Sequence, residues 1–278
     1  MDLALHHLTA LDTDPVTLVD LAADTGCTGV CLFVASPETP LSGGNVDLSF
    51  PAVTEAMLPE VSRRLADRNV RVCNVEYFPL DSNPPFDRFR KGMAIGNALG
   101  ARMAVTHIHD PEPSRAAENL ARLADLAAEH GLDVGLEFMP LSPACPSVHR
   151  AADYVRAAGR RNVRIGVDAL HLARSGGTPA DIARIDPQLI GYAQLCDGPV
   201  GVSADYLAEA LDRQIAGHGS FPLVALAQAL PSHTIYDVET PLPGLAGKGV
   251  SARERTRLAV DGARLVLAAA RHTIEPQQ

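Results

Sequence analysis

The sequence offers little that would place the protein in a membrane or outside the cell. No apolar run approaches the roughly 20 residues that a membrane-spanning helix needs. The first residues, MDLALHHLTALDTD, have no basic stretch leading into an apolar core. The five cysteines form no CxxC pair. We therefore expect a cytoplasmic protein with reduced thiols and no membrane partner.

Positive charge is also scarce. The formal net charge is −9, and basic residues occur only in short clusters such as GRRNVR. Binding to nucleic acid needs clustered Lys and Arg against the phosphates, so we expect no nucleic-acid partner. No GxGxxG motif follows the first predicted strand. This absence disfavours an open doubly wound nucleotide-binding sheet, which is the alternative to the fold proposed below.

The sequence does contain a regular alternation of short apolar runs with Ala- and Leu-rich amphipathic stretches. One predicted helix starts at Asp14 as N-cap with Pro15 in its first turn and ends at Gly26. Another is predicted over 203–216. Strands that are apolar throughout and separated by helices indicate a parallel sheet. The eight predicted strands span residues 2–8, 29–34, 70–78, 102–109, 133–138, 163–170, 190–196 and 233–240.

Eight strand–helix units in a chain of 278 residues predict an α/β fold, a closed (β/α)8 TIM barrel, with residues 1–278 forming one domain. In such a barrel the functional groups lie at the C-terminal ends of the strands. Four neighbouring predicted strands carry oxygen-bearing side chains there: Glu137, Asp168, Gln194 and Glu239.

Three carboxylates at one point would repel one another unless a positive charge lay between them. An all-oxygen ligand set suits a hard divalent cation, so we predict a Mn²⁺ or Mg²⁺ site. Gly135 and Gly166, two residues before Glu137 and Asp168, face the same side as these ligands. Their missing side chains would leave room beneath the ion, or would merely satisfy the need for small residues inside a barrel.

Some of these acids have ordinary explanations. A single acid at a strand end is often a helix cap or a surface charge. Asp197 is as well explained as a turn residue. Asp237 is in phase with Glu239, so it could join the site or point into the layer below.

The segments GLEF, GVDALHLARSGG, GYAQLCDGP and DVET together resemble the xylose isomerase-like TIM barrels, in particular the sugar phosphate isomerase/epimerase family. The resemblance covers nearly the whole chain. It implies that Glu137, Asp168, Gln194 and Glu239 bind the metal ion, that Glu137 and Glu239 move protons on opposite faces of the substrate, and that His171 and Arg213 contact the substrate. Gln194 stands where many relatives have histidine. Some members, including 3-dehydroshikimate dehydratases, also have glutamine there.

This resemblance implies a metal-dependent isomerase or epimerase that acts on a keto-sugar or related hydroxy-ketone through a metal-stabilised enediolate. The alternative is a dehydratase or lyase that uses the same proton abstraction and then loses a β-substituent. Further protonatable groups would favour the lyase. Candidates are Glu76 and the pair His107 and His109, all at strand ends, and His6 or His7, of which only one can face inward. Of these, we expect Glu76 and His107 to bind the substrate.

The substrate is a small molecule whose class stays open. A phosphate would call for a basic cluster or a glycine-rich turn, and only Arg174 with SGG and Lys248 in GLAGKGV offer one. Apolar, proline-rich loops at 32–41, 76–86 and 137–146 suggest an unphosphorylated substrate with an apolar part. They could equally be lids or contacts in a homo-oligomer.

Three other functions compete with this one. A nuclease of the endonuclease IV type would need a His-rich zinc cluster and a basic face. A non-catalytic binding barrel would be signalled by the loss of one acid, yet all three carboxylates are present. A nucleophilic role for Cys145 lacks a His or Asn beside it in sequence.

Overall fold

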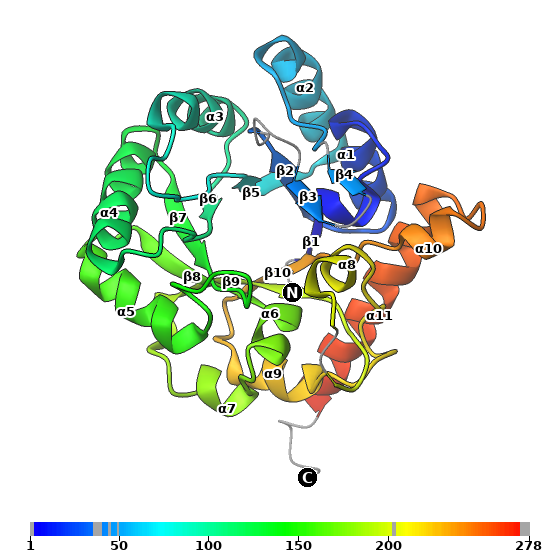
Figure 1. Ribbon diagram of the computed structural model, residues 1–278. Coiled ribbons are helices and arrows are strands. Elements are labelled where there is room, and N and C mark those ends of the chain that lie inside the picture. The colour runs from blue at the N-terminus through cyan, green and yellow to red at the C-terminus, as the bar shows by residue number, and fades with distance from the viewer. Residues whose placement is uncertain (1–2, 36–40, 44–45, 49, 202–203, 273–278) are drawn as a thin grey trace.

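The computed structural model describes residues 3–35, 41–43, 46–48, 50–201 and 204–272. Eight parallel strands close into a barrel in the order β1-β10-β9-β8-β7-β6-β5-β2, with helices packed around the outside (Figure 1). The predicted (β/α)8 architecture is therefore confirmed. The barrel strands are β1 (Leu3–His6), β2 (Gly29–Phe33), β5 (Arg71–Glu76), β6 (Met103–Thr106), β7 (Asp133–Glu137), β8 (Val163–Asp168), β9 (Ile190–Leu195) and β10 (Ile235–Val238). A separate antiparallel pair consists of β3 (Leu41–Gly43) and β4 (Val46–Leu48).

The helices follow the strands along the chain. In α1, the carboxylate of Asp14 accepts hydrogen bonds from the backbone N–H groups of Val16 and Thr17, which confirms the predicted N-cap. The α-helices are α1 (Pro15–Asp24), α2 (Leu58–Arg68), α3 (Phe86–Ala98), α4 (Pro113–Glu129), α5 (Val148–Ala158), α6 (Ala169–Arg174), α7 (Pro179–Ile182), α8 (Tyr206–Leu211), α9 (Leu223–Ala229), α10 (Pro243–Ala246) and α11 (Ala252–His272). Short 3-10 helices occupy η1 (His7–Ala10), η2 (Glu55–Met57) and η3 (Pro187–Leu189).

The helix predicted over 203–216 is wrong in its second half, because α8 ends at Leu211. The backbone N–H of Gln214 donates to the carbonyl of Asp197, and the N–H of Asp197 donates back to Gln214. These groups pair with the segment after β9, so they cannot continue a helix. The N–H of Arg213 also donates to the carbonyl of Pro241. The chain beyond α8 is thereby held against the mouth of the barrel.

Apolar side chains pack in two places. The larger cluster joins the outer faces of the strands to the helices and contains residues such as Leu32, Leu120 and Val260. A smaller cluster of Met103, Val105 and Tyr192 lies apart from it. Burial of a large apolar side chain stabilises the fold by about 1.5–3 kcal/mol.

Polar groups also cross the interior of the barrel. The side-chain amide of Asn74 in β5 donates to Asp237 in β10 over 2.6 Å, although these strands are not neighbours. Asp237 therefore points into the layer below the cavity. No helix among the described residues is long and apolar enough to cross a membrane.

Candidate active site

A cavity of about 240 Å³ opens at the C-terminal ends of the barrel strands. His6, Phe33, Glu76 and Glu137 are the last residues of β1, β2, β5 and β7, and all four line this cavity. The loops at this end can vary without disturbing the barrel, which is why barrel enzymes carry their catalytic groups here. The position of the cavity therefore agrees with an active site.

The four side chains predicted to bind a metal ion lie on neighbouring strands. Glu137 ends β7, Asp168 ends β8, Gln194 lies late in β9, and Glu239 directly follows β10. All four are buried, and all but Asp168 line the cavity. Donor atoms of Glu137, Asp168 and His171 lie within 4.8 Å of one another. The structure thus brings these side chains together as the strand order requires.

An arginine lies between two of these carboxylates. Arg213 Nη1 is 2.7 Å from Asp168 Oδ2, and its Nη2 is 3.0 Å from Glu239 Oε1. Only 4% of Arg213 is exposed. The positive charge of the guanidinium thereby offsets part of the repulsion between the carboxylates. The sequence had suggested a metal ion for this role. Arg213 does line the cavity, as expected of a substrate contact, but two of its donors are engaged by the acids.

Glu137 is surrounded by hydrogen-bond donors. His171 Nε2 is 2.7 Å from its Oε1, and the hydroxyl of Tyr192 donates to its Oε2 over 3.1 Å. His107 Nε2 is 3.6 Å from Oε1. Burial alone would raise the pKa of Glu137, but the hydrogen bonds and charges of His107 and His171 hold it well below its usual range. Glu137 is therefore an ionised, well-oriented carboxylate.

His171 is fixed on both sides. Its ring contacts Glu137 through Nε2 and the hydroxyl of Tyr206 through Nδ1. Its backbone N–H donates to Asp168 Oδ1 over 2.9 Å, which makes Asp168 the N-cap of α6. Burial lowers the pKa of His171, but the charges of Asp168 and Glu137 outweigh this effect and raise it overall.

Tyr206 was missed by the sequence analysis. It lies on α8 and lines the cavity. A helix predicted over 203–216 gave no indication of which of its residues would face the barrel mouth.

The expectation that Gly135 and Gly166 leave room beneath a metal ion is wrong, because the ring of Tyr192 lies against both glycines. A Cβ at Gly166 would lie 2.4 Å from the Tyr192 ring, and one at Gly135 would lie 2.7 Å from it. The tyrosine ring therefore fills this room, and the two glycines are small because the ring needs the space. The hydroxyl of Tyr192 then reaches up to Glu137.

Glu239 and Gln194 each retain a buried oxygen without a partner. Among the described residues, neither Glu239 Oε2 nor Gln194 Oε1 has a hydrogen-bond donor. Burial raises the pKa of Glu239 to about 8, because the favourable charge of Arg213 only partly offsets it and the charges of Asp168 and Glu137 oppose ionisation. Glu239 is therefore more easily protonated than an ordinary glutamate side chain.

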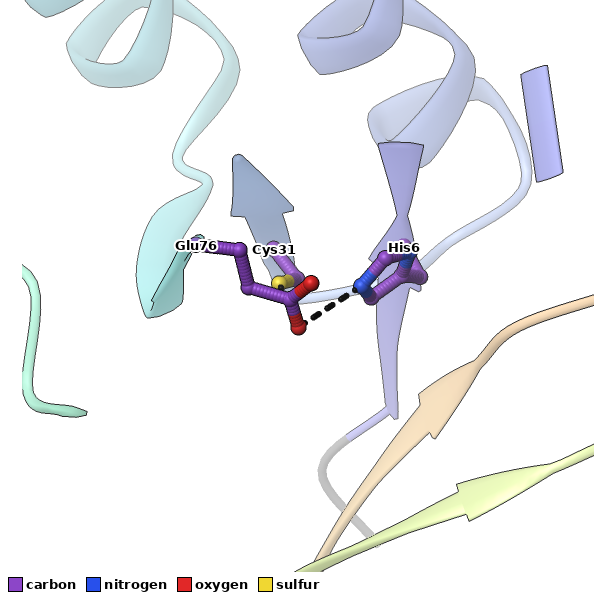
Figure 2. Close-up of side chains that lie close together, drawn as sticks. All are labelled: His6, Cys31 and Glu76. Carbon is purple, nitrogen blue, oxygen red and sulfur yellow. Dashed lines mark hydrogen bonds and ion pairs between the residues drawn. The ribbon is translucent and has the colours of Figure 1, made fainter. Parts of the chain in front are cut away.

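A second polar group consists of His6, Cys31 and Glu76 (Figure 2). His6 Nε2 is 3.0 Å from Glu76 Oε1, and the thiol of Cys31 donates to the same oxygen over 3.5 Å. His6 Nδ1 accepts a hydrogen bond from the backbone N–H of Leu8. Since Nδ1 is an acceptor, Nε2 carries the ring proton and donates to Glu76. This arrangement orients Glu76 and leaves Nε2 no lone pair for a metal ion.

The other histidines separate into two kinds. His107 and His109 both line the cavity, whereas His7 turns away and donates from Nε2 to the carbonyl of Thr13. Only one of the neighbouring residues His6 and His7 therefore faces inward, as predicted. Burial, helped by His107, lowers the pKa of His109 to about 4, so this ring is neutral near pH 7.

The remaining candidates lie outside the cavity wall. Arg174 forms a buried ion pair with Glu209, and Lys248 does not line the cavity.

Burial raises the pKa of the Cys145 thiol to about 12, which removes its nucleophilic form. Asp197 accepts hydrogen bonds from the backbone N–H groups of Gly198, Gly217 and Phe221, as a turn-forming residue does. Of the apolar loop predicted over 32–41, residues 36–40 lie outside the described residues.

The donor set fits a divalent cation. A buried acceptor without a partner costs about 1–3 kcal/mol. Glu239 Oε2 and Gln194 Oε1 are two such acceptors in one cavity, beside the ionised Glu137. A cation bound here would satisfy both atoms and contact carboxylate oxygens as well.

Comparison with known proteins agrees with the fold. The sequence profile of the xylose isomerase-like TIM barrel family matches residues 19–264. The solved structure of the IOLI protein with a bound zinc atom has a TM-score of 0.79 at 17% identity, and the match covers 96% of this chain and 98% of that one. At this identity the likeness shows the shared fold.

Two curated relatives match part of the sequence. The 3-dehydroshikimate dehydratase of Pseudomonas aeruginosa is 31% identical over 113 residues, which cover 40% of this chain and 18% of that protein. The inosose isomerase of Bacillus velezensis is 31% identical over 127 residues, which cover 44% of this chain and 43% of that protein. The matches thus span less than half of each relative.

Proposed function

Since the chain belongs to the xylose isomerase-like TIM barrel family, we propose that it is a divalent-metal-dependent isomerase or epimerase. Its substrate is a keto-sugar or related hydroxy-ketone, and the reaction moves a proton on a carbon beside the carbonyl group. The partial match to an inosose isomerase and the zinc atom bound in the structurally similar IOLI protein support this assignment. The observation that carries it is the pair of buried carboxylates Glu137 and Glu239, which line one cavity from different strands.

The proposed ligands of the metal ion are Glu137, Asp168, Gln194 and Glu239. All four offer oxygen, which favours Mn²⁺ or Mg²⁺ over zinc. When bound, the cation supplies positive charge that stabilises the oxyanion left after proton removal. Elemental analysis should therefore find Mn²⁺ or Mg²⁺, and stoichiometric zinc with full activity would contradict this choice.

The two carboxylates differ in what already binds them. Both oxygens of Glu137 have donors, whereas Oε2 of Glu239 has none among the described residues. We assign the proton transfers to Glu137 and Glu239 on the two sides of the substrate, so that one carboxylate removes the proton and the other side of the site returns one. His171, which contacts Glu137, orients that carboxylate for the transfer.

A second candidate function is a lyase that eliminates a β-substituent after the same abstraction. It is favoured by one observation: Glu76, oriented by His6, and the rings of His107 and His109 also line the cavity. A leaving hydroxyl or alkoxide needs a proton, and this set could supply it. The partial match to a 3-dehydroshikimate dehydratase agrees with this candidate.

Solvent-deuterium exchange tests both candidates. The Mn²⁺-loaded protein is incubated in D₂O with keto-sugars, 3-oxo-glycosides and 3-dehydroshikimate. Deuterium uptake without loss of a group supports the isomerase, and an elimination product supports the lyase. Glu137→Gln and Glu239→Gln should both abolish uptake, while Glu118→Gln on the exposed side of α4 should not. Unchanged uptake in either active-site variant would remove that residue from the mechanism.

A further inference from the structure

The charges of the cavity restrict the substrate. Three carboxylates line it, namely Glu76, Glu137 and Glu239. Arg213 is the only Lys or Arg on the described wall, and it is already paired with Asp168 and Glu239. The positions outside the described residues are neither Lys nor Arg in the sequence. No unengaged guanidinium or ammonium therefore faces the cavity from the described part of the chain.

The histidines of the wall do not supply a free positive charge either. His6 is engaged by Glu76, and His171 by Glu137. His107 lies 3.6 Å from Glu137. His109 forms no ion pair with a carboxylate in the described part of the chain, and burial lowers its pKa to about 4, so it stays neutral. Even with a divalent cation bound, the carboxylates of Glu76, Glu137, Asp168 and Glu239 outnumber the positive charges of that ion and Arg213. A carboxylate or phosphate on the substrate would therefore be repelled on balance and would lose its hydration without compensation.

The wall also has apolar parts, one of which begins beside His6 at Phe33. The rings of Phe33 and Phe50 are stacked with centroids 4.2 Å apart and planes 9° apart, and Tyr77 lies edge-on to Phe50. Leu207 and Leu211, four residues apart on α8, also line the cavity. Leu141, which lines it too, is 49% exposed. At least one apolar residue of the wall, Leu141, therefore lies where the cavity meets solvent.

We infer that the substrate is an uncharged hydroxy-ketone that carries an apolar, preferably flat, substituent. This inference rests on the proposed function for the hydroxy-ketone part, which faces the carboxylates. Glu76, oriented by His6 and Cys31, accepts hydrogen bonds from hydroxyl groups of this part (Figure 2). The substituent lies against Phe33, Phe50 and the α8 leucines and points towards the opening. A glycoside with an aromatic aglycone and a keto group on the sugar has this chemistry, whereas sugar phosphates and 3-dehydroshikimate do not.

Equilibrium binding tests the inference without turnover. Calorimetry on the Mn²⁺-loaded protein compares 4-nitrophenyl β-D-glucopyranoside with methyl β-D-glucopyranoside, and glucose 6-phosphate with glucose. The aryl glycoside should bind at least about tenfold more tightly than the methyl glycoside, as burial of one aromatic ring predicts. The phosphate should bind more weakly than glucose. Equal affinity for the two glycosides, or tighter binding of the phosphate, would overturn the inference.

Two variants sharpen the test. Leu207→Arg should reduce the aryl preference and raise affinity for glucose 6-phosphate, because it places a cation in the apolar part of the wall. Leu265→Arg, on α11 where the leucine is 71% exposed, is the matched control and should change neither. If Leu207→Arg fails to fold, Leu211→Ala should still lower aryl affinity several-fold, and an unchanged preference would count against the inference.

The two proposals fail in different experiments. Deuterium exchange that never occurs would refute the proposed reaction, even if the aryl preference is found. Exchange with simple keto-sugars, combined with no aryl preference, would refute the substrate inference alone.

Discussion

His171 Nε2 lies 2.7 Å from Glu137 Oε1, so the third residue of α6 directly orients the carboxylate at the end of β7. Replacement of His171 by Asn should lower kcat for deuterium exchange by about 100-fold or more, because Glu137 loses the contact that orients it for proton transfer. Tyr206→Phe should have a smaller effect, about tenfold, because it removes only the hydroxyl that holds His171 Nδ1. His233→Asn, at an exposed histidine, is the control. Full activity of the His171 variant would contradict its role.

Arg213 should matter most for stability when no divalent cation is bound. Arg213→Gln leaves two buried carboxylates without their counter-charge, which should lower the free energy of unfolding by about 3–5 kcal/mol. Urea denaturation in EDTA measures this loss. Arg63→Gln breaks an exposed ion pair with Asp67 and should cost less than about 1 kcal/mol. Equal losses in the two variants would show that the buried pairing contributes nothing.

Gly166 should tolerate no side chain while Tyr192 is present. Gly166→Ala should destabilise the protein by about 1–3 kcal/mol, because the new methyl group overlaps the tyrosine ring. In a Tyr192→Val background the same change should cost less than half as much, which a double-mutant cycle on urea midpoints would reveal. Gly247→Ala, whose Cβ would meet nothing closer than 3.5 Å, is the control. Additive costs would disprove direct contact as the cause.

His7 should make stability depend on pH below neutrality. Burial lowers its pKa from 6.5 to about 4, although its hydrogen bond to Thr13 opposes the shift. The unfolded chain therefore binds more protons than the folded one between these pH values, so stability rises with pH across this window. The contribution lost between pH 6.5 and 4 is about 3 kcal/mol.

Comparison with His7→Gln isolates this effect, because Gln retains a donor for the carbonyl of Thr13 and does not titrate. Urea denaturation of both proteins in EDTA should give curves that diverge as the pH falls, with the wild type losing more stability. Parallel curves would show that His7 does not titrate on unfolding.

The sequence contained enough information for the barrel and for much of its cavity. Apolar runs separated by amphipathic helices specify a parallel sheet, and the strand-end rule then places Glu137, Gln194 and Glu239 at one opening. Both inferences depend on local patterns and strand order. Neither needs the path of a loop.

Contacts made by loops and by ring packing were not predictable in this way. Arg213 reaches Asp168 only because the chain leaves α8 early and pairs with Asp197. Local helix propensity gave no sign of this exit. Tyr192 fills the space above Gly166. The sequence alone could not show whether this space is filled or open.

Closure of the barrel joins the two ends of the fold, because β1 pairs with β10 as well as with β2. During synthesis on the ribosome, one edge of β1 has no partner strand until Val238, the last residue of β10, has emerged. An exposed strand edge can pair with other chains. The nascent protein therefore carries an open edge through most of its translation, and slow translation of its last third would prolong that exposure.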